Sequence, residues 1–553
     1  MALNLLIAAL TVVSPLVIKR VVDDVIALQR PQDLPPYLAL IVAVAVLGGL
    51  ARFAYAIGKE QLGQTVITDM RTALYSKLLA LHFGFYDGER TGSLMSRMIG
   101  DVESTRVFLS GIIIDTVYHV TTIVLLLGAF TQQDLLLAII AIVPCALSAL
   151  GLYQLFIARK GIHAKIHEEN ANVSATLQDS LSGIKVVKAY AQEQQELGKF
   201  TIAIDRQKAI NFLGNWTWNT RFPFVNSLQR FMVIALLAVG GLRVMNGEIT
   251  LGTLVAALSF GGLLMVPFAQ LGQQLTTVGQ TAAAALRIFR LLDEPIGIQS
   301  PEFPKPMTDV RGEIEFKHVT FRYAGSTTRA LDDINLLIPA GTSLALVGTT
   351  GSGKTSLAQL IGRLYDPTSG QVLIDGVDAR QLDMHELRRQ IGTVAQDSLL
   401  FSDTIANNIA FGRSDAPRDA IIRAATLSQA SEYIDDLPQG YDTEIGERGV
   451  GLSGGQKQRL AIARAIVLDP RILILDDSLS AVDAETERAL QASFATVMRG
   501  RTTVLIAHRL STVQHADQIV VLKEGRIVEK GTHAELIQRS GYYKDVLDLQ
   551  NMN

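Results

Sequence analysis

The sequence predicts a multi-domain fold: an all-α transmembrane domain of six helices, followed by an α/β domain. At 553 residues the chain is too long for one hydrophobic core. Its composition is also uneven, because long apolar stretches fill the first half while short strands and helices alternate in the second. The mean hydropathy of +0.27, with 48% hydrophobic and 19% charged residues, excludes a wholly soluble protein.

Six stretches are apolar enough to cross a membrane, which takes about 20 residues. No basic segment precedes the first stretch, and Lys19 and Arg20 follow it directly. We therefore expect a membrane span and not a cleavable signal peptide. The fifth contains Gln229 and Arg230 near its start. The six predicted spans are residues 2–18, 37–57, 107–130, 135–157, 225–244 and 251–275.

Basic residues near the span ends predict the orientation. They are frequent between the second and third spans and between the fourth and fifth, whereas the connection at 131–134 has none. Both long connections, and with them the carboxyl-terminal half, are therefore predicted to be cytoplasmic. Structureless loops of that length are rare, so we expect the helices to continue past the membrane and to turn back near 83–105 and 182–196.

The composition changes after residue 293. Segment 294–306 carries four prolines and is typical of a linker, and segment 312–323 then alternates as a strand does. We predict a transmembrane domain at 1–293, a linker at 294–311 and a second domain at 312–553. The net charge of −3 gives no reason to expect a nucleic-acid partner, and the single cysteine, Cys145, excludes an intrachain disulfide.

A glycine-rich turn between a buried strand and a helix, at 343–361, matches the pattern G-x-x-x-x-G-K-[ST]. Such a turn lets backbone N–H groups surround phosphate oxygens at a helix N-terminus. The alternative is a chance glycine-rich turn, which the flanking strand and helix disfavour. The predicted nucleotide-binding residues are Gly348, Thr349, Thr350, Gly351, Ser352, Gly353, Lys354, Thr355 and Ser356.

Two later segments extend this nucleotide site. Asp476 ends the apolar strand 471–475 and is placed to hold Mg²⁺ together with Thr355, although a lone strand-end acid is more often a helix cap or a surface charge. The segment Leu452, Ser453, Gly454, Gly455 and Gln456 begins a helix and makes a second anion-binding terminus. One domain cannot close both termini around one phosphate chain, so a dimer is implied.

With these motifs the chain resembles the ATP-binding cassette (ABC) exporters, in which one membrane domain is fused to one nucleotide-binding domain. The resemblance extends over nearly the whole chain and rests on an ordered set of motifs. The set is the phosphate loop, "VAQDS" with Gln396, "LSGGQ", the Asp476 strand, "SAVD" with Ser480 and Asp483, and "LIAHRLS" with His508.

The resemblance implies ATP and Mg²⁺ as ligands and assigns roles to residues of this chain. Tyr323 would stack on adenine, Gln396 would contact Mg²⁺ or water, and His508 would bond the γ-phosphate. Ser453 and the two glycines after it would hold the γ-phosphate of the partner subunit's ATP, and Asp483 would communicate across the dimer. Without that context a core tyrosine and a packed histidine would be the better interpretations. Segments 86–101 and 189–195 resemble the coupling helices of such exporters.

One residue departs from the family pattern. The acid that orients the attacking water is usually glutamate, and here it is Asp477. Its carboxylate is withdrawn by about 1.5 Å, the length of a C–C bond, and a misplacement of about 1 Å can cost ~10²-fold in rate. The chain therefore resembles the degenerate-site subunit of a bacterial heterodimeric multidrug-type exporter. The alternative is a slower homodimer that tolerates Asp477.

Polar residues in the spans are the only indications of the substrate. Asp115 and His119 lie four apart, on one helical face, and a polar stripe follows in and just beyond the sixth span at Gln270, Gln273, Gln274 and Thr277. Hydrogen bonds between helices explain any single one of these residues equally well. We predict that a dimer in the plasma membrane uses ATP to export hydrophobic or amphipathic compounds. The alternatives are a flippase for lipids or lipid-linked glycans and an ATP-gated regulatory or channel-like protein.

Overall fold

The computed structural model describes residues 2–396, 398–446, 449, 451–476, 496–506 and 513–551. It divides into two compact units, one made of Met1–Leu79 with Thr91–Glu294 and the other of Ala80–Arg90 with Pro295–Asn553. The short segment Ala80–Arg90 thus belongs to the second unit, although it lies between two helices of the first.

The first unit is entirely helical, and six of its described helical stretches are long and apolar enough to cross a membrane, as predicted. Four of its helices contain 43 to 53 residues, far more than the ~20 a bilayer requires, so they extend beyond it. The helices are α1 (Ala2–Arg20), η1 (Val21–Ile26), η2 (Pro31–Asp33), α2 (Leu34–Ala80), α4 (Thr91–Ser96), η3 (Arg97–Asp101), α5 (Val102–Arg106), η4 (Val107–Ile112), α6 (Ile113–Gln133), α7 (Leu135–Ser182), α8 (Ile184–Ala189), α9 (Glu193–Met245) and α10 (Leu251–Asp293).

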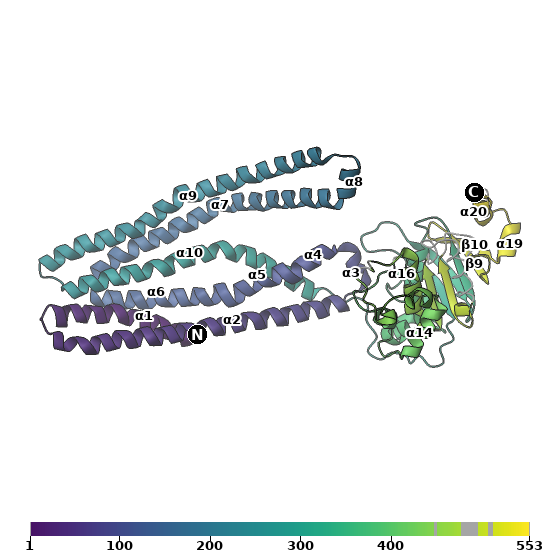
Figure 1. Ribbon diagram of the computed structural model, residues 1–553, viewed down its shortest axis with the longest axis horizontal. Coiled ribbons are helices and arrows are strands. Elements are labelled where there is room, and N and C mark those ends of the chain that lie inside the picture. The colour runs from purple at the N-terminus through teal and green to yellow at the C-terminus, as the bar shows by residue number, and fades with distance from the viewer. Residues whose placement is uncertain are drawn as a thin grey trace. The chain divides into compact units, whose positions relative to one another are not determined.

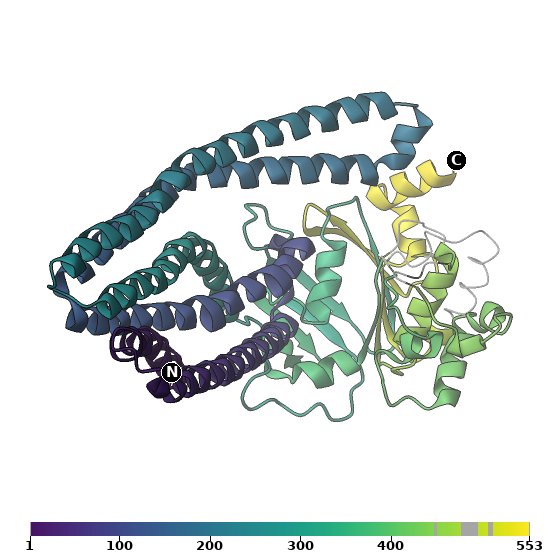
Figure 2. The same ribbon diagram turned by 60° about the vertical axis from the view of Figure 1, so that its left-hand side comes forward.

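Helices α7 and α9 run side by side as a hairpin that is closed by α8 (Figure 1 and Figure 2). Beside the hairpin, α10 packs on both α1 and α6. A buried cluster that includes Leu126, Phe130, Leu236 and Phe260 joins α6, α7, α9 and α10. Many other apolar side chains of the first unit are exposed, as Phe53 of α2 is at 66%, and this is the surface expected to face lipid.

Polar contacts fix the helix ends opposite the long extensions. Asp134 caps α7 by accepting from the Leu137 N–H at 2.9 Å, and its other oxygen pairs with Arg243 at 2.7 Å. Asp23 accepts from the Thr250 hydroxyl at 2.8 Å and from the Gly252 N–H at 2.9 Å, which joins η1 to the start of α10. These bonds set the register between α1 and α10, the helices that line one of the cavities described below.

The second unit is an α/β domain, and its described strands form two sheets. The larger sheet has the order β10-β9-β3-β8-β7-β6, and all of its neighbours are parallel except the antiparallel pair β10–β9. Its central strands β3 and β8 are buried at every residue, as expected for strands with both faces covered. The six strands are β3 (Ser343–Val347), β6 (Ile391–Val394), β7 (Ile472–Asp476), β8 (Thr502–Ile506), β9 (Gln518–Lys523) and β10 (Arg526–Gly531).

The smaller sheet is antiparallel, in the order β2-β1-β4-β5. Its strands are β1 (Ile314–Phe321), β2 (Leu331–Ile338), β4 (Ser369–Ile374) and β5 (Val377–Asp378). Among the described residues, the helices of this unit are α3 (Phe83–Gly88), α11 (Lys354–Ile361), η5 (Ala379–Gln381), α12 (Met384–Arg389), α13 (Ile405–Ala410), α14 (Arg418–Leu427), α15 (Ser431–Ile434), η6 (Gly440–Asp442), α16 (Gly454–Ile466), α19 (His533–Gln538) and α20 (Tyr542–Asn551). The predicted combination of a six-helix membrane domain and an α/β domain is confirmed.

Candidate functional site

The glycine-rich turn connects β3 to α11 at the carboxyl edge of the larger sheet. Gly348 has φ +154 and Gly353 has φ +106, the second a conformation that L side chains rarely adopt. A Cβ at Gly348 would lie 2.3 Å from the Leu522 carbonyl oxygen, and one at Gly353 would lie 2.5 Å from that of Ala330. The close approach of these carbonyl oxygens therefore requires glycine at both positions.

Lys354 is the first residue of α11, and its side chain folds over the turn. The residue is 5% exposed, and its Nζ donates to the carbonyl oxygens of Gly348 and Thr349 at 2.8 and 2.9 Å. The ammonium is thus held inside the curve of the loop, where phosphate oxygens would make stronger charge-assisted hydrogen bonds than carbonyls do. Ser352 is 2% exposed, and its hydroxyl has no hydrogen-bond partner within the described part of the chain.

Thr355 and Asp476 come from segments 121 residues apart and meet at the same edge of the sheet. Strand β8 lies between β3 and β7, and its Ile506 is paired with both Leu346 and Asp476. The Thr355 hydroxyl reaches across and donates to Asp476 Oδ2 at 3.3 Å. The structure therefore brings together two of the three residues predicted to hold Mg²⁺.

These residues fit a magnesium ion bound together with phosphate. No group of three or more His, Cys, Asp and Glu side chains that could hold a metal ion occurs in the described ranges. A site made of one hydroxyl and one carboxylate suits Mg²⁺, which keeps several waters and takes further oxygen ligands from substrate phosphates. The third predicted ligand, Gln396, is exposed two residues beyond β6, the neighbour of β7 in the sheet.

Tyr323 follows β1 and packs on the helix that begins at the glycine-rich turn. Its hydroxyl shares a 2.8 Å hydrogen bond with the Ser356 hydroxyl and donates to Gln359 Oε1 at 3.1 Å. Its ring centroid lies 4.8 Å from that of Phe321 and 5.3 Å from that of Tyr365. Burial raises the pKa of Tyr323, so its phenol stays neutral.

Tyr365 is a site residue that sequence reasoning missed. Its hydroxyl donates to Asp87 Oδ2 of α3 at 2.7 Å, and its ring meets Phe83 of α3 edge-on at 5.8 Å. Burial, together with the neighbouring Asp87 carboxylate, raises the pKa of Tyr365. An aromatic chain therefore runs from Tyr323 through Tyr365 to α3. The only sequence signal was the aromatic residue in "RLYDP", just after α11.

The segment "LSGGQ" forms the predicted helix start. Ser453 caps α16, its hydroxyl accepting from the Gln456 N–H at 3.2 Å while Gln456 Oε1 accepts from the Ser453 N–H at 2.8 Å. Ser453 and Gly454 are exposed. The buried side chains of α16 belong to one core cluster and those of α11 to another, so the two helix N-termini are built on separate parts of the domain.

Four predicted site residues lie outside the described residues. They are Asp477, Ser480, Asp483 and His508. The predictions made for these four rest on the sequence.

Several of the polar residues predicted for the membrane spans meet in a cavity of about 550 Å³ between α2, η4–α6 and α10. It is lined by Asp115, Gln270, Gln273 and Gln274, whereas His119 is not among its lining residues. The Thr277 side chain lies outside the described residues.

Two residues of α2 that sequence reasoning had not assigned to the pathway hold Asp115 in this cavity. Lys59 Nζ pairs with Asp115 at 2.6 Å, and the Tyr55 hydroxyl donates to the same carboxylate at 2.8 Å. The ring of His119 lies instead against Tyr118, with 5.2 Å between the centroids.

The sequence and the structure are similar to known transporters. Residues 1–268 match the family described as ABC transporter transmembrane region, and residues 331–480 match the family described as ABC transporter. Over 550 residues the chain is 37% identical to the uncharacterized ABC transporter ATP-binding protein YknU of Bacillus subtilis, spanning 99% of this chain and 93% of that one.

Two further relatives and one solved structure are similar over almost the whole chain. The ATP-dependent lipid A-core flippase of Desulfotalea psychrophila is 35% identical, spanning 99% of this chain and 95% of that one. A Staphylococcus aureus protein named for multidrug export, an ATP-binding/permease protein, is 37% identical over 97% of this chain and 94% of its own. The structure of a bacterial Atm1-family ABC exporter with ATP bound has a TM-score of 0.83 at 29% identity, covering 99% of this chain and 97% of that one.

Proposed function

The chain belongs to the ABC transporter family, and on that premise we propose that it exports hydrophobic or amphipathic compounds as one half of a heterodimer. Membership of this family establishes the general activity and location of the protein. The protein is an ABC exporter that couples ATP hydrolysis to transport, and it is a multi-pass plasma-membrane protein with a cytoplasmic ATP-binding domain. The proposal adds the class of compound, the roles of single residues and the nature of the partner.

The observation that carries the proposed ATP site is the contact between Thr355 and Asp476 at 3.3 Å. It places a hydroxyl and a carboxylate beside the turn over which Lys354 is folded. Mg²⁺, when bound there, would neutralise part of the phosphate charge. The loop's N–H groups and Lys354 would bind the phosphates, while Tyr323 would hold the adenine.

The proposed catalytic asymmetry rests on Asp477. Shortening the usual glutamate by one methylene leaves the binding residues intact and withdraws the group that orients water, at an expected cost of ~10²-fold in rate. That factor corresponds to about 2.7 kcal/mol of activation free energy. We expect this chain's own site to hold ATP and to split it slowly.

The partner is inferred from the contrast between two motifs of this chain. Its "LSGGQ" segment is intact, with Ser453 exposed at a capped helix start, and would complete the ATP site of another subunit. A subunit with glutamate in place of Asp477 would then supply one fast site to the dimer. A homodimer would contain two slow sites, and this remains the alternative.

Co-purification from the native membrane, followed by sequencing of every associated chain, tests this proposal. The expected result is a second ABC subunit whose strand-end aspartate is followed by glutamate. Recovery of this polypeptide alone, with brisk ATPase activity that Asp477→Glu does not raise, would contradict it.

A lipid flippase is the second candidate, because a relative 35% identical to this chain is named a lipid A-core flippase. Reconstituted dimer would separate the two candidates by its preference for hydrophobic dyes or for fluorescent lipid analogues. A regulatory or channel-like protein would show no stimulation of ATP hydrolysis by either class of compound.

A further inference from the structure

A second cavity, an apolar groove of about 640 Å³, lies between α1, α2 and α10. Three glycines open it, because a Cβ at Gly48, Gly49 or Gly262 would meet no atom within 4 Å. Three hydroxyls line the groove, those of Thr11, Ser14 and Ser259. The hydroxyls of Thr11 and Ser259 are already used, each donating to a carbonyl one turn earlier in its own helix, at 2.8 and 2.9 Å. The groove therefore suits an apolar chain or ring system.

The groove and the polar cavity follow one another along the same helix faces. On α2 the lining residues Ile41, Gly48 and Arg52 of the groove are followed by Tyr55 and Lys59 of the cavity. Steps of three, four and seven residues keep side chains on one face of a helix. At 1.5 Å per residue, the stripe from Ile41 to Lys59 is about 27 Å long.

Helix α10 repeats this order. Its Leu258 and Gly262 line the groove, and Gln270 and Gln274 line the polar cavity. Both helices thus present an apolar section and then a polar section to the same side. An elongated molecule with an apolar body and a polar head matches that sequence of surfaces.

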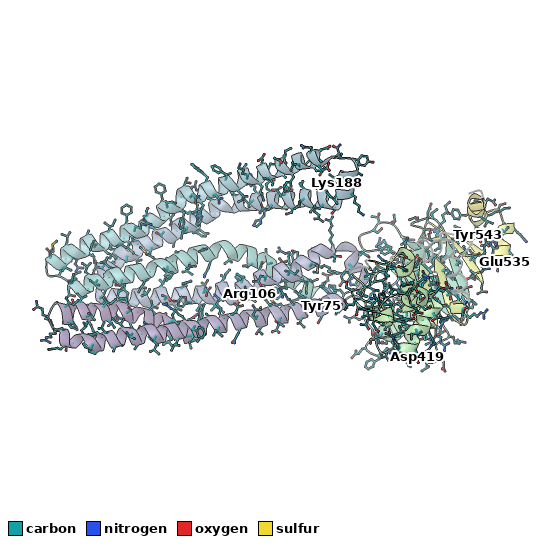
Figure 3. The ribbon with its side chains drawn as sticks, viewed as in Figure 1. Tyr75, Arg106, Lys188, Asp419, Glu535 and Tyr543 are labelled. Carbon is teal, nitrogen blue, oxygen red and sulfur yellow. The ribbon has the colours of Figure 1, made fainter. Side chains whose placement is uncertain are left out.

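The sign of the head group is decided by the charges along the stripe. Lys59 is neutralised by Asp115 at 2.6 Å, and Arg106 (labelled in Figure 3) is neutralised by Glu103 at 2.6 Å. Arg52 lines the end of the groove, is exposed, and has no hydrogen bond or ion pair with any residue that the structure describes.

Glu60 is the other carboxylate that lines the polar cavity besides Asp115. Glu60 accepts from Gln64 at 2.7 Å and lies beyond the predicted span 37–57, where water can solvate it. Arg52 lies inside that span, where an unpaired charge is costly. Its guanidinium is a planar fork that matches carboxylate and phosphate oxygens.

We propose that the groove and the polar cavity form one binding site for an amphipathic anion, which Arg52 recognises by its charge, and that this anion is the exported compound. The inference rests on the proposed export function and narrows its substrate class. A lipid of the bilayer is the other source of the same chemistry, and the experiment below separates the two.

The test uses the complex purified from the native membrane and reconstituted into phosphatidylcholine vesicles. The probes are dansyl-undecanoic acid and its methyl ester, which share the apolar chain and differ in charge. The measurement is the probe concentration that gives half-maximal stimulation of ATP hydrolysis. We expect the acid to act at a concentration about tenfold lower than the ester, as one hydrogen-bonded charge pair would give.

Substitutions of Arg52 connect that difference to the site. Arg52→Gln should remove the advantage of the acid over the ester. Arg52→Lys should keep most of that advantage, and its activity would show that a complex substituted at this position still assembles. Arg230→Gln is the matched control, because Arg230 is an exposed arginine of α9 that lines neither cavity. It should leave the preference for the acid unchanged.

Equal potency of acid and ester in the wild type would overturn the inference, as would a preference for the acid that persists in Arg52→Gln. Loss of the preference when phosphatidylglycerol is mixed into the vesicles would also overturn it, because a bilayer lipid would then occupy the site. Each of these outcomes leaves export itself standing. Failure of both probes and of neutral hydrophobic dyes to stimulate hydrolysis would instead contradict the proposed function.

Discussion

The hydrogen bond between Tyr365 and Asp87 connects α3 to the rest of the ATP-binding domain. A substitution that deletes one oxygen atom removes this bond. Tyr365→Phe deletes the phenolic oxygen, whose distance to Asp87 Oδ2 is 2.7 Å, and leaves the ring between Tyr323 and Phe83. A hydrogen bond to a charged group contributes about 1.5–3 kcal/mol. Asp87 is exposed and regains water when the phenol is lost, so we expect a loss of about 1 kcal/mol.

That loss corresponds to about a fivefold weaker attachment of α3. If α3 carries the signal between transport and hydrolysis, stimulation of ATP hydrolysis by a hydrophobic dye should fall by up to about fivefold. ATP affinity should stay the same, because the packing of Tyr323 on the remaining ring is retained. The assay compares dye-stimulated hydrolysis and nucleotide binding in the same reconstituted complex.

A double-mutant cycle that combines Tyr365→Phe with Asp87→Ala tests whether the two residues act through one bond. The double variant should lose no more stimulation than the stronger of the two single variants, because both remove one bond. Tyr75→Phe is the control, since Tyr75 is an exposed tyrosine of α2 at 58% (Figure 3). Additive losses in the cycle, or unchanged stimulation in Tyr365→Phe, would refute the role given to this bond.

Three further predictions concern the phosphate loop and its metal. Gly353→Ala should abolish nucleotide binding and destabilise the domain by about 1–3 kcal/mol, because its Cβ would lie 2.5 Å from the Ala330 carbonyl oxygen; nucleotide titration and thermal unfolding check this. Lys354→Ala should weaken ATP binding at this chain's site by tenfold or more, and intact turnover despite that loss would show the site to be accessory. Removal of Mg²⁺ by chelation should weaken ATP binding to wild type more than to Asp476→Asn, and an equal effect on both would argue against Asp476 as the metal-holding acid.

Much of the architecture was predictable because strong local constraints are written in the sequence. A bilayer demands about 20 apolar residues in a row, so the six spans were visible without any neighbours. The glycine-rich turn was equally visible. Glycine is the only residue type that fits at positions 348 and 353, because backbone carbonyl oxygens approach both positions closely. Strand β7 ended at Asp476, as its run of apolar residues indicated.

Contacts between distant segments were not predictable. Helical spacing placed Asp115 and His119 on one face, but it did not reveal that Lys59 and Tyr55 of another helix hold Asp115. Nor did it reveal that Tyr365 binds α3, a segment 278 residues earlier. Periodicity identifies the face that a residue occupies, and only the fold decides which element packs on that face.

We propose that this chain binds ATP, splits it slowly because of Asp477, and depends on a partner that carries the glutamate. The most direct measurement is single-turnover hydrolysis at each ATP site of the complex purified from the native membrane, in wild type and in Asp477→Glu. We expect two different chains, one slow site in the wild type, and an acceleration of about a hundredfold at that site in the variant. A complex of identical chains, or equal fast turnover at both sites that Asp477→Glu does not change, would contradict it.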